Sequence, residues 1–317
     1  EVRAQTLTLP AHQVAVTGNY ADYANLGAYE GRENFTPRTP TLFDAYRRHT
    51  GASADSCWVV SNTYLVGEDT DHSLMPGYGP DSGALVVTDY SYTLSDAWVW
   101  DQMAAAMDDN EVALMLVNLH EVDRDGHTED WDAYTASATE ASNAIVGFWE
   151  ELQADPVYQD NTLLLVTTDH GRHLDGVEVG WRSHGCQCQG CRQVFLLAVG
   201  PGIRQGFTSD VSCSFQDVAP TVAHLMGFPF PYHRGRVLTE ILEDGDQVDP
   251  GPGGSFRPRL WGTADLLVRT SERQDTSLGD EEGAHRVAVE LSTDQGETWD
   301  VTVAAGGTAV QHSPVAW

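Results

Sequence analysis

The sequence contains no lysine and few basic residues of any kind. All 17 of its basic residues are arginines, against 29 aspartates and 18 glutamates, and the formal net charge is −30 at pH 7. Because phosphate binding needs clustered cations, such a surface repels nucleic acids and anionic membranes. We therefore expect no nucleic-acid-binding surface. The excess of aspartate is typical of a salt-exposed or extracellular protein, and codon bias toward arginine is an equally good explanation of the missing lysine.

Long apolar stretches are also missing. No segment approaches the roughly 20 apolar residues that span a bilayer, so we expect no transmembrane segment. No secretion signal is visible, but the chain begins with Glu1 rather than Met. We interpret the start as processed, trimmed or missing, and we expect an extracellular or periplasmic protein.

Only five cysteines are present, and three of them, Cys186, Cys188 and Cys191, lie close together. A Cys-x-Cys-x-x-Cys pattern is compatible with a structural zinc ion, or with disulfides within the pattern or to Cys57 or Cys213. Zinc needs four ligands, and the pattern supplies three. An exported protein favours disulfides. The sequence leaves both alternatives open and gives no disulfide connectivity.

The apolar pattern divides the chain into three parts. Residues 1–242 alternate short apolar runs with helical patterns, which predicts an α/β fold with a mostly parallel sheet flanked by helices. Residues 243–256 are acidic and then rich in Gly and Pro, as in a linker. Residues 257–317 have an apolar period of two and no helical signal, so we predict a small all-β module, which the sequence leaves open as complete or incomplete. Helices are expected at 40–48, 95–107, 130–152 and 215–226, and strands at 57–60, 112–119, 162–167, 193–199, 265–270 and 285–291.

Two Asp/His motifs each follow an apolar run that is typical of a buried strand. The first contains Asp123 and His127, and the second is the dipeptide Asp169-His170. Ligands in open α/β sheets bind at the carboxyl ends of the strands, so neighbouring strands would bring both pairs to one edge. Carboxylate oxygens and imidazole nitrogens are ligands of divalent metals. We therefore predict a two-metal hydrolase, to which a later histidine, His184, would contribute.

The spacing inside the first motif suits one ion. Asp123 and His127 stand at positions i and i+4, which lets both side chains reach one ion across a tight turn. Gly126 would permit the backbone to bend there. Asp125 is a competing carboxylate, which we rank below Asp123.

The ordered set of motifs resembles the alkaline phosphatase superfamily, which includes nucleotide pyrophosphatases/phosphodiesterases, cofactor-independent phosphoglycerate mutases and sulfatases. The matching motifs are Asp123-x-x-Gly126-His127, Asp169-His170-Gly171 and His184-Gly185. The resemblance spans roughly residues 4–242 and implies two divalent metal ions, zinc or manganese. By resemblance, one ion is held by Asp123, His127 and His184, and the other by Asp169 and His170 together with the nucleophile and an upstream Asp. His173 is the alternative to His184.

The resemblance also assigns a nucleophile. The stretch Thr6-Leu-Thr8-Leu-Pro10-Ala-His12 is similar to the Thr-Phe-Pro-Asn pattern of the phosphodiesterases, and Thr8 aligns with the nucleophile. A metal-bound hydroxyl is deprotonated more easily, which activates it for in-line attack. Pro10 suits the first turn of a helix, whose N-terminus favours a bound phosphate. Thr6 is the alternative nucleophile.

One ligand of the family pattern is missing. In the family, the first strand ends in an Asp that completes the second metal site, several dozen residues before the nucleophile. Here seven residues precede Thr8, and the first Asp is Asp22, downstream of it. We therefore expect that the domain is N-terminally incomplete and lacks its first strand. This chain alone would then bind the second metal weakly and be impaired, unless Asp22 fills the role.

The motifs favour a phosphatase or phosphodiesterase that acts on a small-molecule phosphoester. Sulfatases carry a modifiable Cys or Ser in a Cys/Ser-x-Pro-x-Arg motif, and the corresponding stretch here is Thr8-Leu-Pro10-Ala-His12. Phosphoglycerate mutases insert a whole domain before the first metal motif, and only 115 residues separate Thr8 from Asp123. The alternatives are a sulfatase-like hydrolase and a catalytically inactive surface-binding protein.

Residues 292–299, Ser-Thr-Asp-Gln-Gly-Glu-Thr-Trp, resemble an Asp-box. In families that carry it, the Asp and Gly shape a hairpin turn and the Trp packs beneath it. One copy predicts a local structure and no glycosidase activity. The β module would do the binding if the metal domain were inactive.

Overall fold

The computed structural model describes residues 6–21, 26–29, 32–91, 93–209, 211–243, 267–274, 285–292 and 301–305. The chain divides into two compact units, Glu1–Gly245 and Asp246–Trp317. Each unit is described by itself. The expected linker lies almost wholly outside the described residues, as do seven of the eight residues that resemble an Asp-box.

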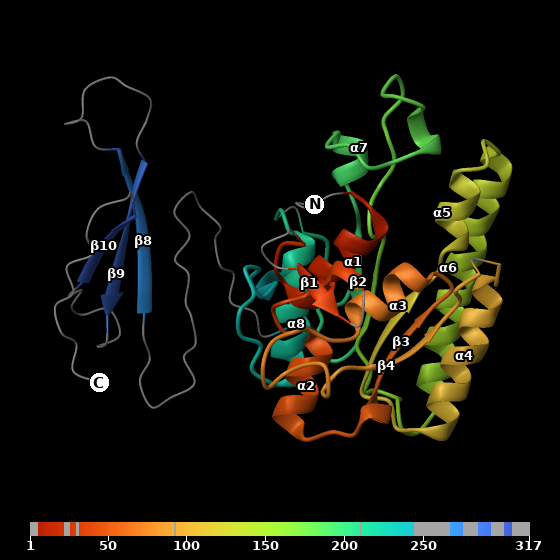
Figure 1. Cartoon of the computed structure of the whole chain (residues 1–317), viewed down its shortest axis with the longest axis horizontal. Coiled ribbons are helices and arrows are strands. Elements are labelled where there is room, and N and C mark those ends of the chain that lie inside the picture. The colour runs from red at the N-terminus through yellow and green to blue at the C-terminus, as the bar shows by residue number, and fades with distance from the viewer. Residues whose placement is uncertain are drawn as a thin grey trace. The chain divides into compact units, whose positions relative to one another are not determined.

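The first unit is an α/β structure whose strands and helices alternate along the chain (Figure 1). Its α-helices are α1 (Thr8–Thr17), α2 (Leu42–Thr50), α3 (Tyr64–Thr70), α4 (Asp96–Asp109), α5 (Glu121–Gly126), α6 (Trp131–Ala154), α7 (Gln189–Arg192) and α8 (Val218–Met226). Its strands are β1 (Leu26–Tyr29), β2 (Arg32–Pro37), β3 (Cys57–Ser61), β4 (Leu85–Thr88), β5 (Leu114–Asn118), β6 (Leu164–Thr167) and β7 (Leu196–Val199). Short 3-10 turns occur at Ala54–Ser56, Gly180–Arg182, Phe215–Asp217 and Thr239–Ile241.

A parallel sheet of order β4-β3-β5 forms the centre of this unit. In its register, Val59 of β3 pairs with Val86 of β4 and with Leu116 of β5. Adjacent residues of β3 face opposite sides of the sheet, and both sides are buried. Val59 packs with residues of α1, α2 and α3, whereas Val60 packs with residues of α4. Helices therefore cover both faces, and the predicted α/β fold is confirmed.

Local sequence sets the ends of the longer helices. Thr41 and Asp44 form a reciprocal capping box at the start of α2. The side chain of Asp130 accepts hydrogen bonds from two backbone N–H groups in the first turn of α6. Gly227 ends α8 with a left-handed φ of 74°. Such signals explain why the predicted helices at 40–48, 130–152 and 215–226 have counterparts in the structure.

The strands that precede the two metal motifs are not hydrogen-bonded neighbours in the described part of the chain. β5, which precedes the Asp123 motif, pairs with β3, and β6, which precedes Asp169, pairs antiparallel with β7. The expectation that neighbouring strands deliver both motifs is therefore wrong at the level of strand pairing. The antiparallel β6–β7 pair forms a two-stranded sheet of its own.

The described residues of the second unit form an antiparallel sheet of order β10-β9-β8. Its strands are β8 (Leu267–Gln274), β9 (His285–Ser292) and β10 (Val301–Ala305). The predicted strands at 265–270 and 285–291 correspond to β8 and β9, and β10 was not predicted. Across all described residues, no helix is both long and apolar enough to cross a bilayer.

Candidate metal site

Asp123 lies at the centre of a group of histidines near the carboxyl end of the parallel sheet. Its Oδ1 is 3.5 Å from Nε2 of His184 and 4.0 Å from Nε2 of His170, and its Oδ2 is 3.5 Å from Nε2 of His127. Ligands of one tetrahedral ion lie roughly 3.4 Å apart when each bonds at about 2.1 Å. The donors around Asp123 are therefore spaced to share an ion.

Asp169 extends this group on the side of His170. Its Oδ2 is 3.4 Å from Nε2 of His170 and 3.8 Å from Nδ1 of His12. All five residues predicted to bind metal thus lie in one continuous set of contacts. We call this set the Asp/His cluster: Asp123, His127, Asp169, His170 and His184.

The protons on two of these histidines can be assigned from their partners. The Nδ1 of His170 lies 3.0 Å from the carbonyl oxygen of Gly171, and the Nδ1 of His184 lies 2.9 Å from that of Thr6. A carbonyl only accepts hydrogen bonds, so each Nδ1 must donate. In the neutral rings each Nε2 then carries a lone pair, and both lone pairs face the carboxylate of Asp123.

That arrangement suits a cation. The Nε2 of His170 is buried and has no hydrogen-bond partner among the described residues. Burial lowers the pKa of His184, and the positive charge of a protonated His170 would lower it further. A neutral ring that turns its lone pair to a carboxylate is repelled unless a positive charge lies between them. A metal-binding histidine usually donates its other N–H to a carbonyl or carboxylate, as both rings do here.

The first motif is helical rather than a tight turn. Asp123 lies within the short helix α5, and His127 follows directly at its C-cap. Gly126 has no left-handed φ. A Cβ at Gly126 would instead collide with the guanidinium of Arg172. The expected role of Gly126 in bending the backbone is therefore wrong, and its small size serves close packing.

Arg172 joins the cluster although the sequence motifs did not indicate it. Its Nη2 donates to Oδ1 of Asp123 at 2.7 Å and to the backbone oxygen of Asp123 at 2.8 Å. The guanidinium also lies 5.4 Å from the ring centre of Tyr134. Arg172 follows Asp169 by three residues, which is the only sign of its role in the sequence. It supplies a fixed positive charge beside the carboxylate.

Thr8 is the first residue of α1, at a helix N-terminus. The Nδ1 of His12 donates to the carbonyl oxygen of Thr8 at 2.7 Å, and Nδ2 of Asn118 donates to Nε2 of His12 at 3.2 Å. His12 therefore links Thr8 to Asp169, from which its ring is 3.8 Å away. The hydroxyl of Thr6, the alternative nucleophile, is buried and donates to the carbonyl oxygen of Cys186 at 2.8 Å.

His173 and Asp22, the two alternative metal ligands, do not lie among the described residues around Asp123. His173, the alternative to His184, lies against Cys186 and Cys191, at 3.0 and 3.2 Å from their sulfurs. It is thus engaged away from Asp123. Asp22 lies outside the described residues.

The chain belongs to the Metalloenzyme superfamily, whose family model matches residues 64–230. These residues include the whole Asp/His cluster and exclude Thr8. The family match agrees with the resemblance to the alkaline phosphatase superfamily that the motifs indicated. Use of divalent metal is supported by the family and by the geometry of Asp123, His170 and His184.

Two curated relatives are 2,3-bisphosphoglycerate-independent phosphoglycerate mutases. The protein from Cyanothece sp. is 30% identical over 164 residues, which cover 49% of this chain and 29% of that protein. The protein from Gloeobacter violaceus is 32% identical over 141 residues, which cover 42% of this chain and 25% of that protein. The chain thus matches less than a third of the length of either relative.

Two solved structures show the fold. The phosphonate monoester hydrolase SpPMH from Silicibacter pomeroyi has a TM-score of 0.51 at 15% identity, over 91% of this chain and 80% of that one. A sulfatase from a glycosaminoglycan-metabolising locus of Bacteroides thetaiotaomicron has a TM-score of 0.51 at 13% identity, over 95% and 78%. At these identities the likeness concerns the fold alone, which is alkaline phosphatase-like.

Proposed function

We propose that the protein is a metal-dependent hydrolase of phosphate monoesters or diesters with a two-metal site. The observation that carries the proposal is the orientation of His170 and His184. Both rings donate Nδ1–H to carbonyls and turn Nε2 toward Asp123. Each ring thus offers a neutral donor beside a carboxylate, so that His184 would bind one dication and His170 a second one next to it.

The ligand sets follow the family pattern. One ion, zinc or manganese, would be held by Asp123, His127 and His184. The second would be held by Asp169 and His170, beside the hydroxyl of Thr8. When bound, the ions would lower the pKa of a coordinated hydroxyl and neutralise negative charge on the phosphoryl oxygens.

Thr8 would act as the nucleophile. Its Oγ forms a bond to phosphorus as the bond to the leaving alkoxide breaks, its proton passes to solvent, and the alkoxide is protonated by water. Water would then cleave the threonine phosphoester, which restores the hydroxyl and releases phosphate from a monoester substrate or a phosphate monoester from a diester substrate. The backbone N–H groups of Thr8 and Leu9 in the first turn of α1 would hold phosphoryl oxygens. His12 would fix the backbone of Thr8 through its Nδ1–H.

Arg172 would favour an anionic substrate. The chain carries a net charge of −30, which repels phosphate esters from most of its surface. The guanidinium of Arg172 lies beside Asp123 and would offset that repulsion at the site. We place such a substrate among extracellular or periplasmic small molecules, because the acidic composition is typical of proteins there.

The proposal is tested by turnover of model esters by the full-length protein. We expect hydrolysis of p-nitrophenyl phosphate or bis-p-nitrophenyl phosphate with added zinc or manganese. Thr8→Ala should lose at least about 10³-fold in rate while it retains metal, and Thr8→Ser should recover part of the rate. Thr139→Ala is a matched control, since Thr139 is an exposed helix residue whose hydroxyl bonds only within α6.

Two results would overturn it. Full activity of Thr8→Ala would remove the nucleophile assignment. Turnover of p-nitrophenyl sulfate, without turnover of either phosphate ester, would favour a sulfatase-like hydrolase instead.

A further inference from the structure

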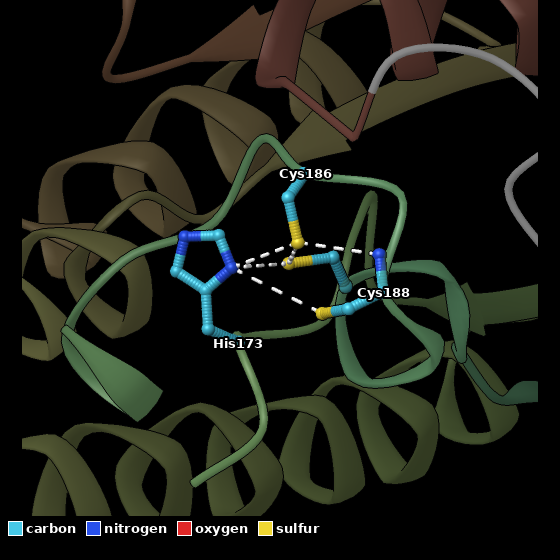
Figure 2. Close-up of side chains that lie close together, drawn as sticks. His173, Cys186 and Cys188 are labelled. Atoms are coloured by element: carbon cyan, nitrogen blue, oxygen red, sulfur yellow. Dashed lines mark hydrogen bonds between the residues drawn. The ribbon is translucent and has the colours of Figure 1, made fainter. Parts of the chain in front are cut away.

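A second group of metal-ligand side chains lies outside the Asp/His cluster. It comprises His173, Cys186, Cys188 and Cys191, and we call it the thiol cluster. Figure 2 shows the imidazole of His173 directed at the sulfur atoms. One ligand atom from each of the four residues lies within 4.8 Å of every other. His173 and Cys191 are buried.

The separations fit one tetrahedral zinc ion. Zinc bonds sulfur at about 2.3 Å and imidazole nitrogen at about 2.0–2.1 Å, which sets sulfurs about 3.8 Å apart and the nitrogen about 3.6 Å from each sulfur. The sulfurs of Cys186 and Cys191 are 3.7 Å apart. The Nδ1 of His173 is 3.0, 3.2 and 4.0 Å from the sulfurs of Cys186, Cys191 and Cys188. A disulfide would bring two sulfurs to about 2.05 Å, and none of the five cysteines forms a disulfide in the structure.

The environment of the ring also favours a metal at its Nδ1. The Nε2 of His173 makes no hydrogen bond among the described residues, but it lies 3.2 Å from the negatively charged Oε2 of Glu178. The carboxylate favours a proton on Nε2, which leaves Nδ1 as the basic nitrogen that faces the three sulfurs. A carboxylate behind a metal-bound histidine is a recurrent arrangement that fixes the tautomer and strengthens the ligand.

The pKa values of the thiols of Cys188 and Cys191 are shifted in opposite directions. A hydrogen bond from the side chain of Cys186 is the main cause that lowers the pKa of Cys188 to about 5. Burial raises the pKa of Cys191 to about 12. Neighbouring negative charges oppose the ionisation of all three thiols together. A dication removes that opposition, and its binding releases the remaining protons.

We propose that His173, Cys186, Cys188 and Cys191 bind a structural zinc ion that holds the Asp/His cluster in place. Four protein ligands leave no open position for substrate, which is the mark of a structural site. The proposal for the ion rests on these donors and does not depend on the proposed hydrolase activity.

Backbone contacts connect this ion to the candidate metal site. His184 stands two residues before Cys186, whose carbonyl oxygen accepts from Thr6 at 2.8 Å. The N–H of Gly171, next to His170, donates to the carbonyl oxygen of Cys191 at 2.8 Å. The zinc ion would thereby fix three segments that the Asp/His cluster and Thr8 depend on.

The test measures zinc directly. After dialysis against a mild chelator, the full-length protein should retain one zinc ion per chain, and Cys188→Ser should lose it. Cys213→Ser is the matched control, because Cys213 is a cysteine outside the cluster, and it should retain the ion. Replacement of zinc by Co²⁺ should give thiolate-to-cobalt charge-transfer absorption in the wild type and in Asp123→Asn.

Native mass spectrometry of the wild type keeps the proposal testable even if Cys188→Ser does not fold. After the same dialysis against a chelator, we expect one zinc ion with the concurrent loss of the thiol protons. Three results would overturn the proposal: a zinc-free wild type, loss of two hydrogen atoms that marks a disulfide within the cluster, and unchanged zinc in a folded Cys188→Ser variant.

Discussion

The Asp/His cluster and the thiol cluster are neighbours in sequence but opposites in chemistry. His170 and His173 are three residues apart, and His184 and Cys186 are two apart. The Asp/His cluster offers oxygen and nitrogen donors and keeps one side open, since the side chain of His127 is 41% exposed. The thiol cluster offers soft sulfur donors, and the side chain of His173 is fully buried at 0% exposure.

The difference in donors and exposure assigns a catalytic role to the Asp/His cluster and a structural role to the thiol cluster. An open set of hard donors leaves room for substrate beside a metal ion, whereas a closed set of four ligands serves structure. The ligands of the thiol cluster come from a short stretch of chain, between residues 173 and 191. Those of the Asp/His cluster come from two distant motifs and from His184, so they need something that fixes their relative position. The segments 170–173 and 184–186 each carry a residue of both clusters, so a metal ion in the thiol cluster would fix the position of His170 and His184.

The largest expected effect is on metal binding and rate at the Asp/His cluster when its central carboxylate is removed. Asp123→Asn removes the negative charge around which three histidines converge. We expect loss of the metal of the Asp/His cluster and a decrease in rate of at least about 10³-fold. Zinc in the thiol cluster should remain, as measured by metal analysis after chelation. Loss of both ions would show that the clusters are not separate.

A second prediction concerns the backbone contact between the clusters. A Cβ at Gly171 would collide with the carbonyl oxygen of Gly190, which lies between Cys188 and Cys191. Gly171→Ala should lower the free energy of unfolding by about 1–3 kcal/mol and weaken metal binding at both clusters.

Gly147→Ala is the control for that change. Gly147 lies in α6, and a Cβ there meets nothing within 4 Å. Because alanine favours helix over glycine, it should raise the free energy of unfolding by about 0.5–1 kcal/mol. Thermal unfolding with zinc titration compares the two variants, and equal effects would contradict the proposed contact.

A smaller effect is expected at Arg172, whose side chain contacts the Asp/His cluster through Asp123. Arg172→Gln removes a cation that contacts Asp123 and should lower kcat/KM for phosphate esters by about 10–100-fold. Zinc in the thiol cluster should be unchanged. Arg182→Gln is the control, since Arg182 pairs with the exposed Glu129. A loss of the same size in the control would point to net charge rather than to the position of Arg172.

The smallest effect concerns a carboxylate outside both clusters. Burial raises the pKa of Asp89, but hydrogen bonds from Ser91 and from the N–H groups of Thr93 and Leu94 outweigh it and lower the pKa to about 2. Asp89 therefore stabilises the folded state above the ordinary aspartate pKa, and this contribution is lost as pH falls through about 4 toward 2.

Asp89→Asn should be less stable than the wild type at pH 6, and the difference should shrink as pH falls through this range. Denaturant unfolding of the metal-free proteins at several pH values measures this difference in the free energy of unfolding. A difference that grows toward low pH would contradict the assignment.

Much of the fold was predictable because its elements carry strong local signals. The long helix expected at 130–152 corresponds to α6, whose cap, Asp130, and apolar spacing are both local. By contrast, α3 and β4 lie in a stretch rich in Gly and acidic residues that gave no readable pattern. Val66 of α3 is buried only because α1, α2 and β3 pack around it, which no local window contains.

The site was predictable to the extent that its residues form motifs. The five predicted ligands converge, although their role as ligands stays a prediction. Arg172 and His12 escaped prediction because Asp123 and Asp169, the carboxylates beside them, are distant from them in sequence. His173 was considered only as a substitute for His184, and the cysteines that it faces begin 13 residues later. Only tertiary contact shows that His173 supplies the fourth donor that the cysteine pattern needs.

Anomalous diffraction from a crystal at the zinc absorption edge tests the two-centre account most directly. The account predicts one peak within bonding distance of His173 Nδ1 and the three sulfurs, and separate peaks in the Asp/His cluster, one beside Asp123 and His184 and one beside Asp169 and His170. A disulfide in place of the first peak, or no peak in the Asp/His cluster of a zinc-loaded crystal, would contradict it.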